Sequence, residues 1–200
     1  MRAPGRTSTR DRILVVATDL FGRRGVDAVS LDLIATEVGV AKQTLLYWFP
    51  SKDELLQAVV AQAASELAVV IEAAVRASGD DPLDRIDAVV RAVFRPAVRR
   101  PALLGLIRDV SRLPGSVATS LTDQLRPLAE RAQVYLRAEM DAGRLRRADP
   151  GLVAALAYAT VTGIATEPEA LRVNGWEPTT PGLRKLRDEL LAFLRAALQP

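Results

Sequence analysis

Neither cysteine nor histidine occurs in this 200-residue sequence. The absence of cysteine excludes disulfide bonds, thiolate nucleophiles and cysteine-based metal sites. The absence of histidine removes the commonest general base and the commonest metal ligand. No glycine-rich phosphate-binding loop precedes a helical pattern either. An enzyme built on this chain would have to rely on carboxylates or arginine alone, so we predict no catalytic residue, no metal site and no cofactor.

Long uninterrupted apolar runs are also scarce, because charged residues interrupt the apolar stretches. This pattern predicts no membrane-spanning segment and no membrane partner. Residues 1–11 are polar and lack the apolar stretch of a signal peptide. We therefore expect a cytoplasmic protein. The net charge of +3 is too small to indicate nucleic-acid binding by itself.

Positive charge is concentrated at the start of the chain. The first twelve residues contain four arginines and a single acidic residue, Asp11; the arginines are Arg2, Arg6, Arg10 and Arg12. This clustering predicts a flexible basic arm over residues 1–8, of the kind that meets a nucleic-acid backbone. The alternative is a solvated, disordered end with no partner.

The spacing of apolar residues predicts an all-α fold of about nine helices. Apolar residues recur every three or four positions, and the period-two alternation of strands is missing. Apolar residues make up 49% of the chain, which is ample for a helical core. One uninterrupted helical pattern runs from Ser51 to about Ala77.

Prolines mark several of the predicted helix boundaries. Asp81 and Asp149 each stand directly before a proline, a pair typical of an N-cap followed by the first helical residue. Pro127 lies inside the pattern over residues 116–141 and predicts a kink or a split there. Residues 167–179 contain two prolines and predict a loop before the last helix.

Residues 30–48 carry the pattern of a helix-turn-helix. Ser30 is a candidate N-cap of the first helix. A small residue at Ala35 allows two helices to cross closely, Gly39 supplies the positive φ of the turn, and Val40 and Leu45 face inward. The second helix of such a motif lies in the DNA major groove. Taken alone, these positions also fit an ordinary corner in a helical bundle.

The flanking sequence favours the DNA-binding interpretation. Upstream, an amphipathic helix ends at Phe21 and Gly25; downstream, Ser51 begins a capping box completed by Glu54. With the IA-x-x-x-GV core and the segment LYWFPSKDEL, residues 12–56 resemble the N-terminal DNA-binding domain of the tetracycline-repressor (TetR) family of bacterial transcriptional regulators. The resemblance covers about the first third of the chain. It implies a three-helix DNA-binding domain over residues 9–56 and a helical ligand-binding and dimerisation domain over residues 57–200.

The candidate DNA contacts lie at helix starts and on the second helix of the motif. Lys42 can donate to guanine, Gln43 can pair with adenine, and the methyl group of Thr44 can touch thymine. Ser30 and Lys52 begin helices whose backbone N–H groups can meet phosphates. The alternative is that these residues are a helix cap and solvated polar side chains.

In one respect the sequence departs from the family. Members usually carry tyrosine directly after the Thr-Leu pair, where this sequence has Leu46. The phosphate contact of that tyrosine cannot be carried over to leucine. Tyr47 or Trp48 could supply it, and for both residues core packing is the alternative.

The resemblance further implies a homodimer and a small-molecule effector. Helices over about 150–165 and 181–198 would pair with the same helices of a second subunit, and an intramolecular core face is the alternative. Candidate effector-binding residues are Phe94, Arg108, Tyr135 and Tyr158, although aromatic residues at helical spacing usually belong to the core. The shortage of polar groups inside predicts a small, largely apolar effector.

Together these features favour a ligand-responsive transcriptional regulator. We expect a repressor that binds a palindromic operator in double-stranded DNA as a dimer and is released by its effector. The alternative from another class is an all-α protein–protein interaction module without DNA binding.

Overall fold

The structure, a computed structural model, describes residues 8–99, 102–112, 116–166, 168–177 and 179–200. The regular elements of the described residues are all helices, which confirms the predicted all-α class. They are α1 (Thr9–Arg24), α2 (Leu31–Val38), α3 (Lys42–Trp48), α4 (Lys52–Ala77), α5 (Pro82–Arg99), α6 (Ala102–Arg112), α7 (Ser116–Asp141), α8 (Pro150–Thr166), α9 (Pro168–Val173) and α10 (Thr180–Leu198).

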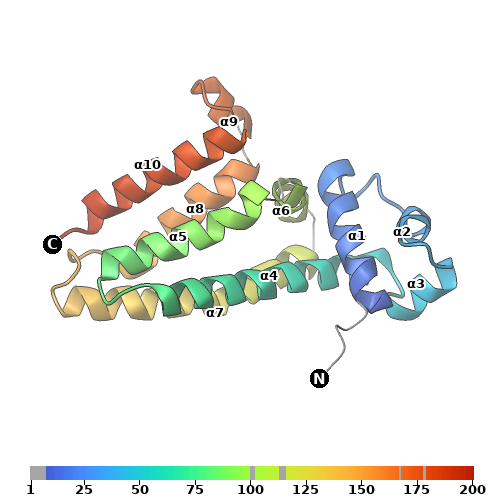
Figure 1. The fold of residues 1–200 in the computed structure, drawn as a ribbon, viewed down its shortest axis with the longest axis horizontal. Coiled ribbons are helices and arrows are strands. Elements are labelled where there is room, and N and C mark those ends of the chain that lie inside the picture. Colours follow the sequence, from blue (N-terminus) through green and yellow to red (C-terminus); the bar gives the residue numbers. More distant parts are fainter. Residues whose placement is uncertain (1–7, 100–101, 113–115, 167, 178) are drawn as a thin grey trace.

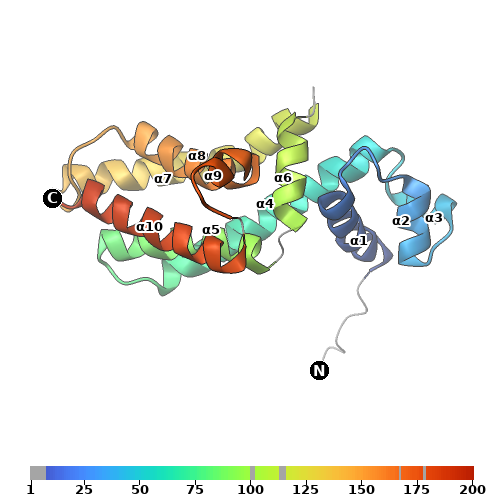
Figure 2. The same ribbon diagram turned by 90° about the horizontal axis from the view of Figure 1, so that it is seen from above.

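The helices form an elongated arrangement with α1, α2 and α3 at one end (Figure 1). Helix α4 runs from this end along the remaining helices and packs against α1, α5 and α7. Helix α10 packs on α5, and α8 packs on α6 and α7. Seen from above, α6 stands across the long helices, between them and α1 (Figure 2). Two helices, α4 and α6, therefore connect the first three helices to the rest.

Side chains cap several helices as the sequence predicts. Ser30 Oγ accepts from the Leu33 N–H at 3.1 Å, and Ser51 Oγ accepts from the Glu54 N–H at 3.1 Å. Asp81 and Asp149 each accept two backbone N–H groups in the first turns of α5 and α8. Each cap satisfies donors that a helix N-terminus leaves unpaired.

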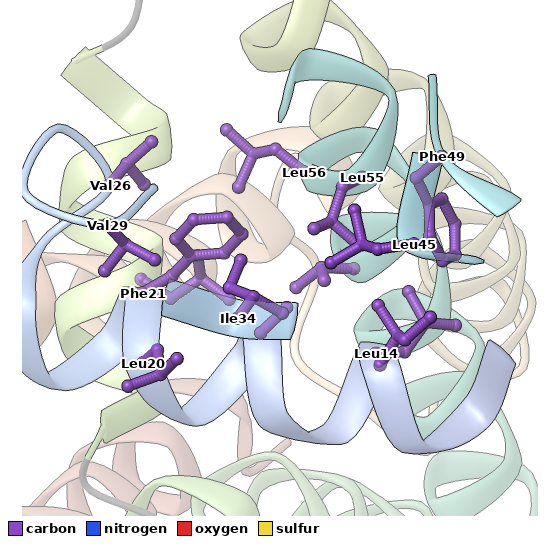
Figure 3. Packing of buried hydrophobic residues seen from close by; sticks show 14 of the residues in the cluster. Leu14, Leu20, Phe21, Val26, Val29, Ile34, Leu45, Phe49, Leu55 and Leu56 are labelled. Atoms are coloured by element: carbon purple, nitrogen blue, oxygen red, sulfur yellow. The ribbon is translucent and has the colours of Figure 1, made fainter. Parts of the chain in front are cut away.

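The first three helices share one apolar core with the start of α4 (Figure 3). Phe21, Ile34 and Leu45 have no exposed surface within it. Leu106 and Val110 of α6 belong to the same core. The first three helices are thus packed against α6, which lies far beyond them in the sequence. A second core joins α5 to α10, and a third joins the ends of α7 and α10.

One expectation about the helices was wrong: part of residues 167–179, expected to be a loop, forms the short helix α9, so the described residues form ten helices where about nine were expected. Pro127 was expected to kink or split the helix over residues 116–141, and α7 continues through it without a split. A proline removes one backbone hydrogen bond, and α7 also packs against α4, α6 and α8, which stabilises the helix despite this loss.

The expectation that charges interrupt every apolar stretch does not hold for α4. Of the described helices, α4 alone is long and apolar enough to cross a membrane by length and composition, with a mean hydropathy of 1.7 in its most apolar part. The reason is its Ala and Val content, since Glu66 and Glu72 are the only charged residues between Leu55 and Val75. By itself one such helix is weak evidence of a membrane span; α4 packs against three other helices, with 17% of its most apolar part buried.

Candidate nucleic-acid interface

The turn between α2 and α3 has the geometry that the sequence predicts. Gly39 ends α2 in the left-handed region, with φ of 76°. Its N–H and that of Val40 both donate to the Ala35 carbonyl at 3.0 Å. This reversal needs a positive φ, which glycine adopts without steric cost. Leu45 then anchors α3 with no exposed surface, so the opposite face of α3 points away from the protein.

That outward face carries the residues predicted to contact DNA. Lys42, Gln43, Thr44 and Tyr47 are all exposed. Tyr47 exposes 79% of its surface and Trp48 exposes 41%, and their rings meet edge to face with centroids 5.3 Å apart. Core packing therefore does not account for Tyr47. The aromatic residue buried here is Phe49, whose extended backbone directly after α3 turns it into the core.

The ammonium group of Lys42 is paired within the protein. Its Nζ lies 2.8 Å from Oδ2 of Asp32, in the first turn of α2, and both side chains are mostly exposed. This pair joins the start of α2 to the start of α3 on the surface of the motif. The role of Asp32 is not predictable from the sequence, because a pair that is ten residues apart on two helices follows only from how the helices cross.

Ser30 and Lys52 lie at the starts of α2 and α4. Ser30 caps α2 and is otherwise exposed. Lys52 reaches back to the loop before α2, with its Nζ 3.5 Å from the Asp27 carbonyl oxygen. Two helix N-termini with polar side chains thus flank α3, an arrangement that suits phosphate groups.

Two arginines of α1 also reach the motif. The Arg10 guanidinium lies over the Phe49 ring, 5.4 Å from its centroid. Arg12 donates to the carbonyl of Val38 at the end of α2. Residues 1–7 of the predicted basic arm lie outside the described residues. Arg10 and Arg12, which the sequence placed in the same basic cluster, belong to α1 and put positive charge beside the ends of α2 and α3.

Helix α6 contacts α1 so closely that only glycine fits at the crossing. A Cβ atom added to Gly105 would lie 2.3 Å from the carbonyl oxygen of Gly22. Next to this crossing, Oδ2 of Asp109 accepts the backbone N–H of Val26 at 3.0 Å. A shift of α6 therefore acts directly on α1 and on the loop that leads to α2.

The four candidate effector-binding residues lie against different partners. Phe94 is buried between α5 and α10, with Leu183 and Leu190 among its neighbours. Arg108 lies on α6, 3.7 Å from an oxygen of Asp109. Tyr158 is exposed on α8. Among the described residues, no cluster of acidic side chains could hold a metal ion.

Tyr135 is half-buried, and its surroundings are polar. The Arg85 guanidinium lies 5.3 Å from the centroid of its ring, and its hydroxyl is buried without a hydrogen-bond partner. Burial raises the pKa of Tyr135, and the charge of Glu139 adds to the shift. Glu139 is itself buried and meets Nε of Arg144 at 2.5 Å. That hydrogen bond holds the pKa of Glu139 below its usual value despite burial.

Apolar side chains are left exposed on the two helices predicted to form a dimer. Helix α8 contains no charged residue, yet Leu152 and Leu156 each expose 63% of their surface. Phe193 of α10 exposes 64%. A Cβ atom at Gly163 of α8 would meet nothing within 4 Å. An apolar helix exposed to water in this way calls for a partner surface.

Comparisons with known proteins agree with this geometry. Residues 13–59 match the sequence model of the bacterial regulatory proteins of the tetR family. The chain is 35% identical over 89 residues to the transcriptional activator FasR of Mycolicibacterium smegmatis, covering 44% of this chain and 40% of FasR. It is 29% identical over 132 residues to the transcriptional repressor KstR of Rhodococcus jostii, covering 66% of this chain and 60% of KstR. The chain thus aligns with less than two thirds of either relative.

The whole fold has solved counterparts. FadR from Bacillus subtilis, a transcriptional regulator whose structure contains stearoyl-CoA, superposes with a TM-score of 0.77 over 92% of this chain and 96% of its own. The sequence identity is 15%, so this likeness establishes the fold.

Proposed function

Because the chain belongs to the TetR family of bacterial regulatory proteins, we propose that it is a ligand-responsive repressor that binds a palindromic operator as a homodimer. The observation that carries this proposal is the outward face of α3. Leu45 fixes the helix to the core, while Lys42, Gln43 and Thr44 stay exposed in its first turn. A recognition helix contacts base edges from that turn.

Each exposed side chain has a role that its chemistry suits. Lys42 donates to guanine O6 or N7, Gln43 pairs with adenine, and Thr44 touches a thymine methyl group. Tyr47 and Trp48, beside them, contact the sugar-phosphate backbone. Ser30 and Lys52 position phosphates at the starts of α2 and α4 and carry no sequence information.

Dimerisation follows from the apolar surface of α8 and α10. Pairing these helices with the same helices of a second subunit would cover Leu152, Leu156 and Phe193. A twofold dimer places two recognition helices against two half-sites, about 34–36 Å or a multiple apart. Operator palindromy then mirrors the symmetry of the protein.

Effector binding would act through α6 as well as α4. We place the effector among the helices of residues 57–200, where Phe94 offers an apolar contact and Arg108 and Tyr135 supply polar groups. Stearoyl-CoA bound to the similarly folded FadR supports an effector with a large apolar part. Its binding would shift α6, and the Gly22–Gly105 crossing would pass the shift to α1. Operator affinity falls because the effector binds the shifted conformation more tightly.

This function requires neither catalysis nor a cofactor. The relatives FasR and KstR are both named as transcriptional regulators. Operator DNA lies in the bacterial cytoplasm, so we place the protein there.

Selection from random DNA tests the proposal. The full-length protein is incubated with a pool of random duplexes, and bound DNA is recovered and sequenced over several rounds. We expect enrichment of an inverted repeat. Enrichment of no sequence, with weak binding that salt abolishes equally for all duplexes, would instead support the interaction module without DNA binding.

A further inference from the structure

The surface of the helix-turn-helix motif carries a negative charge where DNA would bind. Asp32 lies in the first turn of α2, two residues after Ser30, and its side chain is 63% exposed. Its carboxylate holds the Lys42 ammonium at 2.8 Å. A carboxylate repels phosphate, so Asp32 opposes the electrostatic attraction on which non-specific DNA binding depends.

The pair is not needed to hold the fold together. Both side chains are more than half exposed, and ion pairs in such positions contribute little to stability. The apolar core beneath them, with Ile34 and Leu45 fully buried, already fixes how α2 and α3 cross. The position of the pair therefore matters for what approaches this surface.

We propose that Asp32 is a specificity-determining residue that acts through Lys42, and this rests on the proposed DNA-binding function. A lysine ammonium has three donors, so Lys42 can stay bound to Asp32 while it donates to a guanine acceptor. On the operator, Asp32 orients Lys42 toward its base. On DNA that offers no acceptor there, Lys42 stays with Asp32 and the carboxylate repels the nearby phosphates. Discrimination thus comes partly from a penalty on the wrong sequence.

The experiment compares wild type and Asp32→Asn on two duplexes by fluorescence anisotropy. One duplex is the best sequence that wild type selects from random DNA, and the other is a scrambled version. Asp32→Asn removes the charge and keeps the shape of the side chain. We expect its affinity for scrambled DNA to rise roughly 3–10-fold, with a salt dependence steeper by about one unit. Affinity for the selected duplex should change less than about twofold, because lost repulsion and lost orientation offset each other.

Control variants separate this role from a general effect of charge. Glu37→Gln removes one charge from the exposed surface of the same helix, five residues further on, and should leave the ratio of the two affinities unchanged. In a Lys42→Ala background, Asp32→Asn should raise the affinities for the selected and the scrambled duplex equally, because the lysine that Asp32 orients toward its base is no longer present. Asp32→Ser provides a second removal of the charge, and thermal unfolding checks that each variant is folded.

The outcomes separate a failure of the proposed role of Asp32 from a failure of the proposed DNA-binding function. If wild type does not discriminate the two duplexes, the proposed function fails. If wild type discriminates and Asp32→Asn shifts both affinities equally, or weakens only the selected duplex, the role of Asp32 is overturned while the function stands.

Discussion

Gly105 of α6 faces the carbonyl of Gly22 in α1 at a distance that leaves no room for a Cβ atom, which would lie 2.3 Å from the oxygen. The hydrogen bond from Val26 to Asp109 lies beside this crossing. Leu106 and Val110 of α6 belong to the apolar core that α1, α2, α3 and the start of α4 share. Close packing transmits displacement, because packed interiors are nearly incompressible. We therefore propose that the α1–α6 contact is a direct route from the helices of residues 57–200 to α3, the proposed recognition helix.

Replacing Gly105 with alanine should force α1 and α6 apart. Overpacking against backbone costs about 1–3 kcal/mol, and alanine returns up to about 1 kcal/mol in helix propensity. We expect a net loss of folding free energy, measured by urea unfolding, together with altered operator affinity. Gly79→Ala is the control, because a Cβ atom there meets nothing within 4 Å. Equal stability of the two variants would show that the crossing is not tight in solution.

Substitutions on α3 and α4 should separate sequence recognition from phosphate binding. Lys42→Ala and Gln43→Ala should each cost about 1–3 kcal/mol on the selected duplex and relax sequence preference. Lys52→Ala should weaken binding to all sequences alike and reduce the salt slope by about one. Anisotropy titrations on selected and scrambled duplexes measure both quantities. Loss of specificity from Lys52→Ala with none from Gln43→Ala would reverse the assigned roles.

Charge on the exposed face of α8 should break the dimer. The double substitution Leu152→Glu and Leu156→Glu places two carboxylates where an apolar surface would be covered, and burying unpaired charge is strongly unfavourable. Sedimentation equilibrium should report a monomer. Val69→Glu, at an exposed apolar position of α4, should leave the dimer intact. A double variant that sediments as wild type would place the interface elsewhere.

The Glu139–Arg144 pair should make part of the stability depend on pH. The pKa of Glu139 is lowered in the folded protein, so the pair stabilises the fold above the unfolded pKa of about 4.3. This contribution is lost as pH falls through the lower folded value. Urea unfolding should show Glu139→Gln less stable than wild type at pH 7, with the difference shrinking below about pH 4. Glu130→Gln, on the exposed part of α7, is the control. A difference that stays constant down to pH 3 would contradict the assignment.

The features that sequence predicted well are local ones. Caps such as Ser30 and Ser51 bond to backbone groups three residues away, and Gly39 sets the turn by its own φ. The Asp32–Lys42 pair and the Gly22–Gly105 crossing depend on how separate helices meet, which no periodicity encodes. At Pro127, the local sequence favours an interruption of the helix, yet α7 is continuous and packs against neighbouring helices, which a single residue's propensity does not reveal.

The most direct test of the central claim is a titration of the full-length protein with the DNA upstream of its own gene and with scrambled DNA. Fluorescence anisotropy is recorded at two salt concentrations, and the selected duplex serves as a third probe. We expect tight, sequence-selective binding to the selected duplex that weakens steeply with salt, and the same binding upstream of the gene if it controls itself. Equal, weak binding to all three duplexes at both salt concentrations would contradict the claim that the exposed face of α3 recognises DNA.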